Sequence, residues 1–177
     1  MPIVRSPDRP IHLPMDYPSD PAEQFLAASA ALTAFEVVEL QGTGMSESYW
    51  NLLLGRVGSA IAGEFLSACG SAFAKSRNAK ELEAALGKRV MNDPKYGPIA
   101  QRIITLWYMG TWSAMPSAWS DTYGSCMNDV SQVVSPKAYR EGLVWPAFGT
   151  HPQAAKPMGY GSWSYPPLVK VNTDAEP

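Results

Sequence analysis

Side chains suited to acid–base catalysis near neutral pH are scarce in this sequence. Histidine, the usual residue for that role, occurs twice in 177 residues, at His12 and His151. A Ser-His-Asp or Cys-His arrangement would have to use His151, which lies in a Thr-His-Pro turn, and no Gly-x-Ser-x-Gly motif supplies a nucleophile. We therefore expect His151 to form hydrogen bonds in a turn or at an interface, and we expect that the chain is not an enzyme.

The glycine pair Gly42 and Gly44 follows an apolar stretch and has the spacing that begins a dinucleotide-binding loop. The position of the third glycine is taken by Glu47, whose carboxylate would repel a pyrophosphate at a helix N-terminus. The pair therefore predicts the end of a helix, and not a phosphate site.

Metal ligands are not grouped in the sequence. The close carboxylate pairs in predicted helices have no histidine companion, and we expect them on solvated faces; they are Glu36 with Glu39 and Glu81 with Glu83. The loop carboxylates Asp121 and Asp129 lack the alternating oxygen pattern of a calcium loop. The sequence gives no support for a metal site.

The two cysteines, Cys69 and Cys126, are too few and too far apart for a zinc site or a Cys-x-x-Cys redox pair. Cys69 falls in a helical pattern and is predicted to be a buried small apolar residue. Cys126 falls in a polar loop and is the better candidate for a disulfide. Because no Cys-x-x-Cys-His motif occurs, we expect no haem c, and no other cofactor, on this chain.

Composition excludes other classes of function. Charged residues make up 17% of the chain and hydrophobic residues 46%, against roughly 25% charged in an average soluble domain. A net charge of −2 without a basic stripe argues against nucleic-acid binding. No apolar run reaches the roughly 20 residues that span a bilayer, and the first residues lack the apolar centre of a secretory signal. We expect a protein that covers part of its surface with a partner.

The spacing of apolar residues predicts an all-α fold, a small bundle of about four helices. Residues 1–21 hold six of the 16 prolines and predict an extended arm. Residues 22–110 form the helical body. Its predicted helices run from Asp20 to about Gln41, from Ser46 over about 25 residues, from Asn78 to about Met91, and from Pro98 to Gly110. Residues 111–177 form a loop-rich aromatic tail, with one possible turn of helix at 136–141, which packs on the body and on a partner.

The aromatic residues are the one dense feature. Trp107 and Tyr108, at the end of the fourth predicted helix, are expected to pack in the core. Later aromatic residues lie among prolines and glycines that permit neither a long helix nor a central strand, so we predict that they contact a partner, together with His151. The predicted interface is Trp145, Phe148, His151, Tyr160, Trp163 and Tyr165. Stacking on a sugar is the alternative, in which Trp145, Tyr160 and Trp163 make the chain a carbohydrate-binding module.

Three blocks in this order resemble a known family. They are Ala34-Phe-Glu-Val-Val-Glu-Leu-Gln-Gly-Thr-Gly44, Ile103-Ile-Thr-Leu-Trp-Tyr-Met-Gly110, and Tyr139-Arg-Glu-Gly-Leu-Val-Trp145 with Lys156-Pro-Met-Gly-Tyr-Gly-Ser-Trp163. The chain is similar over roughly residues 22–168 to the small subunit of bacterial flavin-dependent fructose, sorbitol, glucose and gluconate dehydrogenase complexes.

The resemblance implies a non-catalytic role in a periplasmic complex that is attached to the membrane through its partners. The catalytic partner would be a flavoprotein of the glucose–methanol–choline type carrying FAD, and a multihaem cytochrome c would accept the electrons. The small subunit would assist the folding or export of the flavoprotein. Family members often begin with a twin-arginine signal, whereas this sequence begins with the proline-rich arm. Some relatives also carry a cysteine in the tail, and this chain has none between Leu143 and Pro177.

Overall fold

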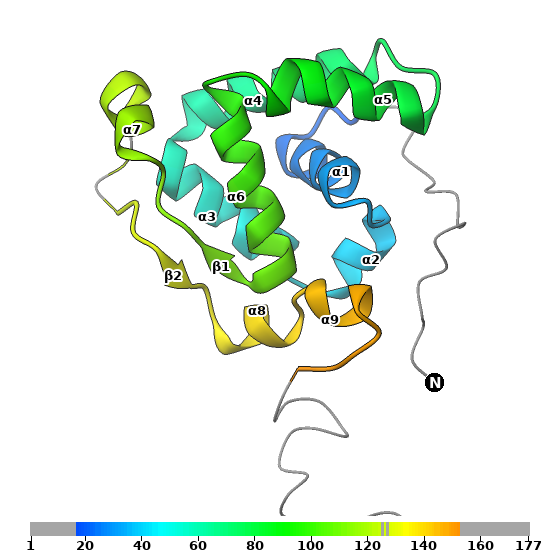
Figure 1. Cartoon of the computed structure of the whole chain (residues 1–177), viewed down its shortest axis with the longest axis vertical. Helices are drawn as coiled ribbons and strands as arrows, with labels where there is room; N and C mark the ends of the chain where they lie inside the picture. Colours follow the sequence, from blue (N-terminus) through cyan, green and yellow to red (C-terminus); the bar gives the residue numbers. More distant parts are fainter. Residues whose placement is uncertain (1–16, 125, 127, 153–177) are drawn as a thin grey trace, which may run out of the picture.

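The computed structural model describes residues 17–124, 126 and 128–152, and this part of the chain is mostly helical, which confirms the all-α prediction (Figure 1). Helices in the first half are more numerous and shorter than predicted. In chain order the elements are α1 (Pro21–Thr33), α2 (Val37–Gly42), α3 (Ser46–Val57), α4 (Ser59–Phe73), α5 (Ala79–Leu86), the π-helical turn η1 (Gly87–Met91), α6 (Tyr96–Met109), β1 (Thr111–Trp112), α7 (Ser117–Tyr123), β2 (Gln132–Val133), α8 (Pro136–Arg140) and α9 (Val144–Ala147).

Helix α1 begins as the sequence predicts. The Asp20 carboxylate accepts hydrogen bonds from the backbone N–H groups of Ala22, at 2.9 Å, and of Glu23, at 3.1 Å, and Pro21 occupies the first helical position. Small and apolar side chains of α1 cover most of its circumference, so the helix can pack against neighbours on several sides. Helices α2, α3, α4 and α6 all contact it. The buried residues of α1 are Phe25, Leu26, Ala27, Ala28, Ser29, Ala30 and Thr33.

The prediction of one helix up to Gln41 is wrong in its second half. Ala34 adopts the left-handed conformation, with φ 57° and ψ 31°, and ends α1. Helix α2 then begins with a cap in which the Glu39 carboxylate accepts a hydrogen bond from the backbone N–H of Glu36 at 2.8 Å. This pair of carboxylates therefore starts a helix. Helix α2 ends at the Gly42–Gly44 pair, as expected.

The predicted long helix from Ser46 is two helices, α3 and α4, whose axes bend by 117°. The break is at Gly58, which has φ +81°, a conformation that side-chain-bearing residues rarely adopt. The apolar stripe is continuous in sequence because both helices face the same core. No single helix among the described residues is long and apolar enough to cross a membrane, and the bent α3–α4 pair passes that test only by length and composition.

Gly55, Gly58 and Gly63 interrupt the apolar stripe, a pattern that predicts close packing against a neighbouring helix, and the structure shows no such packing. A Cβ atom placed on any of the three would meet nothing within 4 Å. Gly58 is needed for the turn, while Gly55 and Gly63 face open space on exposed sides of α3 and α4.

The next helices follow the predicted signals. The Asn78 side chain accepts a hydrogen bond from the backbone N–H of Glu81 at 2.9 Å and starts α5, which continues through η1 to Met91. Helix α6 begins at Tyr96, two residues before the predicted start at Pro98. The Asp93 carboxylate accepts hydrogen bonds there from the backbone N–H groups of Lys95 and Tyr96.

Trp107 lies in the core, as predicted, with 1% of its surface exposed. Its ring stands edge-on to Tyr49 of α3, with centroids 4.8 Å apart, and is stacked with Phe25 of α1 at 6.4 Å. Tyr108 also faces inward: its hydroxyl donates a hydrogen bond to the carbonyl of Thr33 at 2.9 Å. The aromatic residues of α6 thus join α1 and α3.

The core continues after α6. Strands β1 and β2 pair antiparallel, with Thr111 opposite Val133. The Asp129 carboxylate, which the sequence left without a role, accepts hydrogen bonds from the indole of Trp112 at 2.7 Å and from the backbone N–H of Met115 at 2.8 Å. Trp112, Met115 and Trp119 are all buried. Residues 111–124 therefore pack on the helical body.

Candidate partner-binding site

The structure describes three of the six residues predicted to bind a partner, namely Trp145, Phe148 and His151. Tyr160, Trp163 and Tyr165 lie outside the described residues. Helices α8 and α9 hold the first three at the lower end of the molecule as drawn in Figure 1, below α6 and beside α2. The predicted turn of helix at 136–141 is α8.

Helix α8 is fixed against the end of α6 by close backbone packing. Ser135 caps α8 by accepting a hydrogen bond from the backbone N–H of Ala138 at 3.0 Å, and Ala138 is fully buried. Gly110, with φ +66°, lies directly against Ala138. A Cβ atom on Gly110 would be 2.5 Å from the carbonyl of Ala138. The position of α8 thus depends on a glycine at residue 110.

Helix α9 is fixed in a similar way. The backbone N–H of Leu143 donates a hydrogen bond to the carbonyl of Trp107 at 3.0 Å, and the Leu143 side chain is buried. Helix α8 has a further attachment. The ammonium group of Lys137 on α8 donates a hydrogen bond to the carbonyl of Gly44 at 2.9 Å, and this bond joins α8 to the connection between α2 and α3. The two short helices are therefore attached to the core at several points.

Trp145 is half-buried, and its own neighbourhood holds it. The indole Nε1 donates a hydrogen bond to the carbonyl of Tyr139 at 2.7 Å, and the ring stands edge-on to the Tyr139 ring, with centroids 5.3 Å apart. Its backbone carbonyl accepts a hydrogen bond from Thr150 at 2.9 Å. Trp145 therefore stabilises the chain around α8 and α9, and sugar stacking would have to use the part of the ring that Tyr139 leaves open.

Phe148, directly after α9, has 80% of its surface exposed, the largest fraction among the exposed large apolar residues of the described chain. Most of the others lie on elements at the same end of the molecule: α2, the last turn of α6, β2 and α8 (Figure 1). We call these residues the apolar end surface; it consists of Val38, Met109, Val133, Tyr139 and Phe148. Exposed large apolar side chains are candidates for contact with a partner.

Sequence reasoning found only one member of this surface, Phe148. Val38 follows another valine, and because adjacent helical residues point in different directions, one of the two had to face away from the core. Met109 and Val133 fit the apolar patterns of a helix and a strand, so their exposure has no sequence signal of its own.

His151 is exposed, and its Nδ1 lies 3.3 Å from the carbonyl oxygen of Pro152. Within the described part of the chain, its ring forms no hydrogen bond or ion pair with an aspartate, glutamate, serine or cysteine. The geometry is that of a turn histidine and supports neither a catalytic triad nor a metal ligand. Within residues 17–124, 126 and 128–152, no group of three histidine, cysteine or acidic residues is placed to hold a metal ion.

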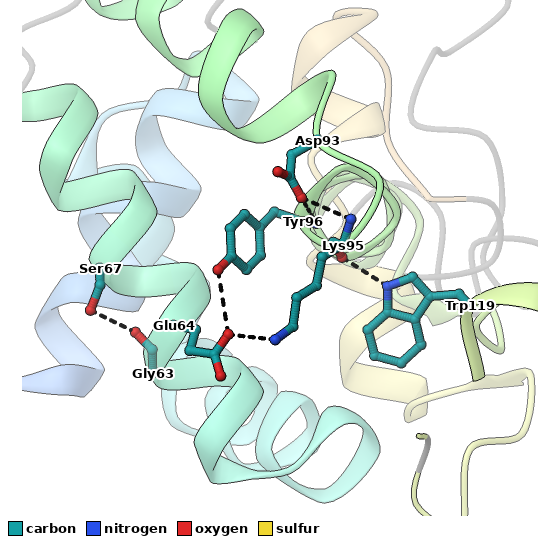
Figure 2. A network of polar contacts seen from close by, with 7 residues as sticks. All are labelled: Gly63, Glu64, Ser67, Asp93, Lys95, Tyr96 and Trp119. Carbon is teal, nitrogen blue, oxygen red and sulfur yellow. Dashed lines mark hydrogen bonds and ion pairs between the residues drawn. The ribbon is translucent and has the colours of Figure 1, made fainter. Parts of the chain in front are cut away.

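A polar network between α4, α6 and α7 was not found from the sequence (Figure 2). Glu64 of α4 forms an ion pair with Lys95, and its carboxylate also accepts a hydrogen bond from the Tyr96 hydroxyl at 3.4 Å. The indole of Trp119 donates a hydrogen bond to the backbone carbonyl of Lys95 at 2.8 Å. Glu64 and Lys95 are 31 positions apart in the chain, so only the fold brings them together.

The electrostatics of this network favour a structural role. The hydrogen bond from Lys95 lowers the pKa of Glu64, and the hydrogen bond to Glu64 raises the pKa of Lys95. Both shifts favour the charged forms at neutral pH, whereas a general acid or base needs a pKa close to neutrality. Burial, followed by the charge of Glu64, raises the pKa of Tyr96, so its hydroxyl stays protonated. The network holds three helices together.

Cys69 is fully buried, as predicted, and burial raises the pKa of its thiol to about 12. A thiol with such a pKa is not a nucleophile at neutral pH. Cys126 is half-buried and forms no disulfide, so its predicted pairing is not realised in the described chain. Its backbone N–H donates a hydrogen bond to the carbonyl of Arg56 at 3.2 Å.

Comparison of the chain with models of protein families, with curated proteins and with solved structures finds no match. The site therefore stands on its geometry: two short helices hold aromatic residues at one end of a helical body, and most of the exposed large apolar residues belong to elements at that end.

Proposed function

We propose that this chain is the non-catalytic small subunit of a periplasmic, membrane-associated FAD-dependent sugar or polyol dehydrogenase complex. In this proposal the chain assists the folding or export of a flavoprotein of the glucose–methanol–choline type, and a multihaem cytochrome c subunit completes the complex. FAD and haem c would belong to these partners. The proposal combines the order of the three sequence blocks with one structural observation, the apolar end surface.

The apolar end surface supports binding to a protein partner for a physical reason. Apolar area left in water costs roughly 25 cal/mol per Å² compared with the same area buried. Aromatic side chains are also the ones that contribute most to protein interfaces. Phe148, at 80% exposure on a helix end that the core holds in place, is positioned to enter a pocket of a partner without rearrangement.

Co-expression tests the proposal. The chain is produced together with a flavoprotein dehydrogenase of the glucose–methanol–choline type from the same organism, and co-purification and the flavin content of the partner are measured. We expect a stable complex, a soluble flavoprotein only when both chains are present, and no flavin or haem absorption from the small chain alone. A flavoprotein that folds, is exported and turns over equally well without this chain would disprove the proposed role.

A single substitution identifies the surface that binds. Phe148→Ser should weaken association by roughly 2–4 kcal/mol, the range for an aromatic anchor, while leaving the melting temperature of the free chain almost unchanged. Val130→Ser is the matched control, because Val130 is also exposed, at 53%, but lies outside the apolar end surface on the segment before β2. If the two variants weakened association equally, the assignment of Phe148 to the interface would be wrong.

A further inference from the structure

A groove of about 470 Å³ lies between α3 and the segment that leads into β2. On α3, residues four positions apart lie above one another, so Asn51 with Gly55 and Leu52 with Arg56 form two adjacent rows, which make one wall of the groove. The segment 128–132 lies opposite and leads into β2. The second wall consists of Asn128, Val130 and Gln132.

Arg56 is the unusual residue of this groove. Only 7% of its surface is exposed, yet its Nε has no hydrogen-bond partner. Among the described residues no carboxylate forms an ion pair with Arg56, and the ion pair there is Lys95 with Glu64. Burying a guanidinium without a counter-charge is costly. An anion that binds from solution would supply the missing counter-charge.

The acidic residue nearest in sequence to the far wall is already engaged. Asp129 lies between Asn128 and Val130, but both of its carboxylate oxygens accept hydrogen bonds, from the indole of Trp112 and from the backbone N–H of Met115. None of the described residues that line the groove is acidic. Its other polar side chains are carboxamides, which can both donate and accept hydrogen bonds.

We infer that this groove binds a small hydroxycarboxylate. The planar guanidinium of Arg56, which lines the groove, has the fork geometry that pairs with the two oxygens of a carboxylate. The carboxamides of Asn51, Asn128 and Gln132 are suited to hydroxyl groups, and Leu52 and Val130 cover the carbon chain. This site uses α3 and the segment before β2, and it is independent of the partner-binding role of the apolar end surface.

Gly55 keeps the groove open. It precedes Arg56 on α3, is exposed, and a Cβ atom placed on it would meet nothing within 4 Å. A larger side chain here would occupy the space beside the guanidinium and leave Arg56 itself unchanged. Because leucine is a better helix former than glycine, Gly55→Leu should block the groove without loss of helix stability.

Lactate, the simplest hydroxycarboxylate, tests the inference, with propane-1,2-diol as a neutral probe that lacks only the carboxylate. Binding of each to the full 177-residue chain is measured by ligand-observed NMR and by thermal shift. We expect saturable binding of lactate and at least about tenfold weaker binding of the diol, as expected for the loss of charge-assisted hydrogen bonds. Chloride at equal ionic strength should not compete.

Three variants locate the binding. Arg56→Gln and Gly55→Leu should each weaken lactate binding by about tenfold or more. Gly63→Leu is the matched control, because Gly63 is likewise an exposed helical glycine facing open space, on α4. It should bind lactate like the unaltered chain. If Arg56→Gln fails to fold, Gly55→Leu still decides the question.

Several results would overturn the inference. These are the absence of saturable lactate binding, equal binding of lactate and the diol, competition by chloride that indicates a general anion effect, or lactate binding that survives in the folded Gly55→Leu variant. Association with the flavoprotein is unaffected by any of these outcomes, so a failure here is distinguishable from a failure of the proposed subunit role.

Discussion

Trp107 and Trp145 lie in two regions of the molecule that use an indole in opposite ways. Trp107 is packed between α1 and α3, and its Nε1 is buried without a hydrogen-bond partner. Trp145 is half-buried near the surface, and its Nε1 donates a 2.7 Å hydrogen bond to Tyr139. In the core, the free energy gained by burying the ring outweighs the cost of an indole N–H without a partner. At the end of the molecule, the hydrogen bond of the N–H fixes the orientation of the ring.

The two regions also differ in what supports them. Helix α6 has 14 residues and contacts α1 and other elements along its length, while α8 and α9 have five and four residues. Helices that short are not stable alone, so the end region takes its conformation from contacts with Gly110 and Trp107. The helices of the core therefore stabilise one another, whereas the conformation of the end region depends on its contacts with the core.

The largest effect should follow from Trp107→Ala. It leaves a cavity between α1, α3 and α6, and we expect the free energy of unfolding to fall by about 3–5 kcal/mol, measured by urea denaturation. Trp107→Phe should cost less, because it also removes an unsatisfied N–H. Phe148→Ala, at the exposed end, should change the stability by less than about 0.5 kcal/mol. Equal losses at residues 107 and 148 would abolish the distinction between the two regions.

The next largest effect should come from Gly110→Ala, at the boundary between the regions. The added Cβ would overlap the carbonyl of Ala138, and φ is positive at this position. We expect a loss of about 2 kcal/mol or more and greater quenching of Trp145 fluorescence by iodide as α8 moves away. Gly63→Ala, the control in open space on α4, should be neutral or stabilising by up to about 1 kcal/mol. Normal quenching in Gly110→Ala would show that α8 does not depend on this contact.

A smaller, local effect is expected for Trp145→Phe, which removes the Nε1 donor and keeps an aromatic ring. The loss should be about 0.5–1.5 kcal/mol, and amide hydrogen exchange should accelerate in α8 and α9 but not in α6. If α6 exchanges faster as well, the end region is part of the core. Trp145→Ala should additionally weaken partner association, and so should Trp163→Ala, which lies outside the described residues, each by roughly 2–4 kcal/mol.

The smallest effect concerns pH and the exposed Glu64–Lys95 pair. The hydrogen bond from Lys95 lowers the pKa of Glu64 below its ordinary value, so the contribution of Glu64 to stability is present above that ordinary value and is lost as the pH falls through the folded-state pKa. Lys95 behaves oppositely: its raised pKa gives a contribution that is lost only in strong alkali. Exposed pairs contribute little, so Glu64→Gln should lower the melting temperature slightly at pH 7 and not at all at pH 2. A difference that persists in acid would contradict the ion pair.

Features set by neighbouring residues could be predicted from the sequence. The caps at Asp20 and Asn78, the helix end at Gly42–Gly44 and the turn of helix after Ser135 depend on interactions within about four positions. The burial of Trp107 and Cys69 also followed, because a long apolar stripe must face a core. The break at Gly58 was missed because the stripe continues across it: periodicity records which residues are buried and not where the backbone turns.

The sequence by itself determined that this chain is helical, that Trp107 is core, and that its chemistry-bearing residues are few. Only the tertiary structure decided that Glu64 meets Lys95, that the Nε of Arg56 is buried without a hydrogen-bond partner, and that Met109 is exposed. The physical reason is that burial and charge pairing depend on which segments, tens of positions apart, lie against each other. Local propensity does not say which of these distant segments come into contact. Their packing around α1 and α6 decides it.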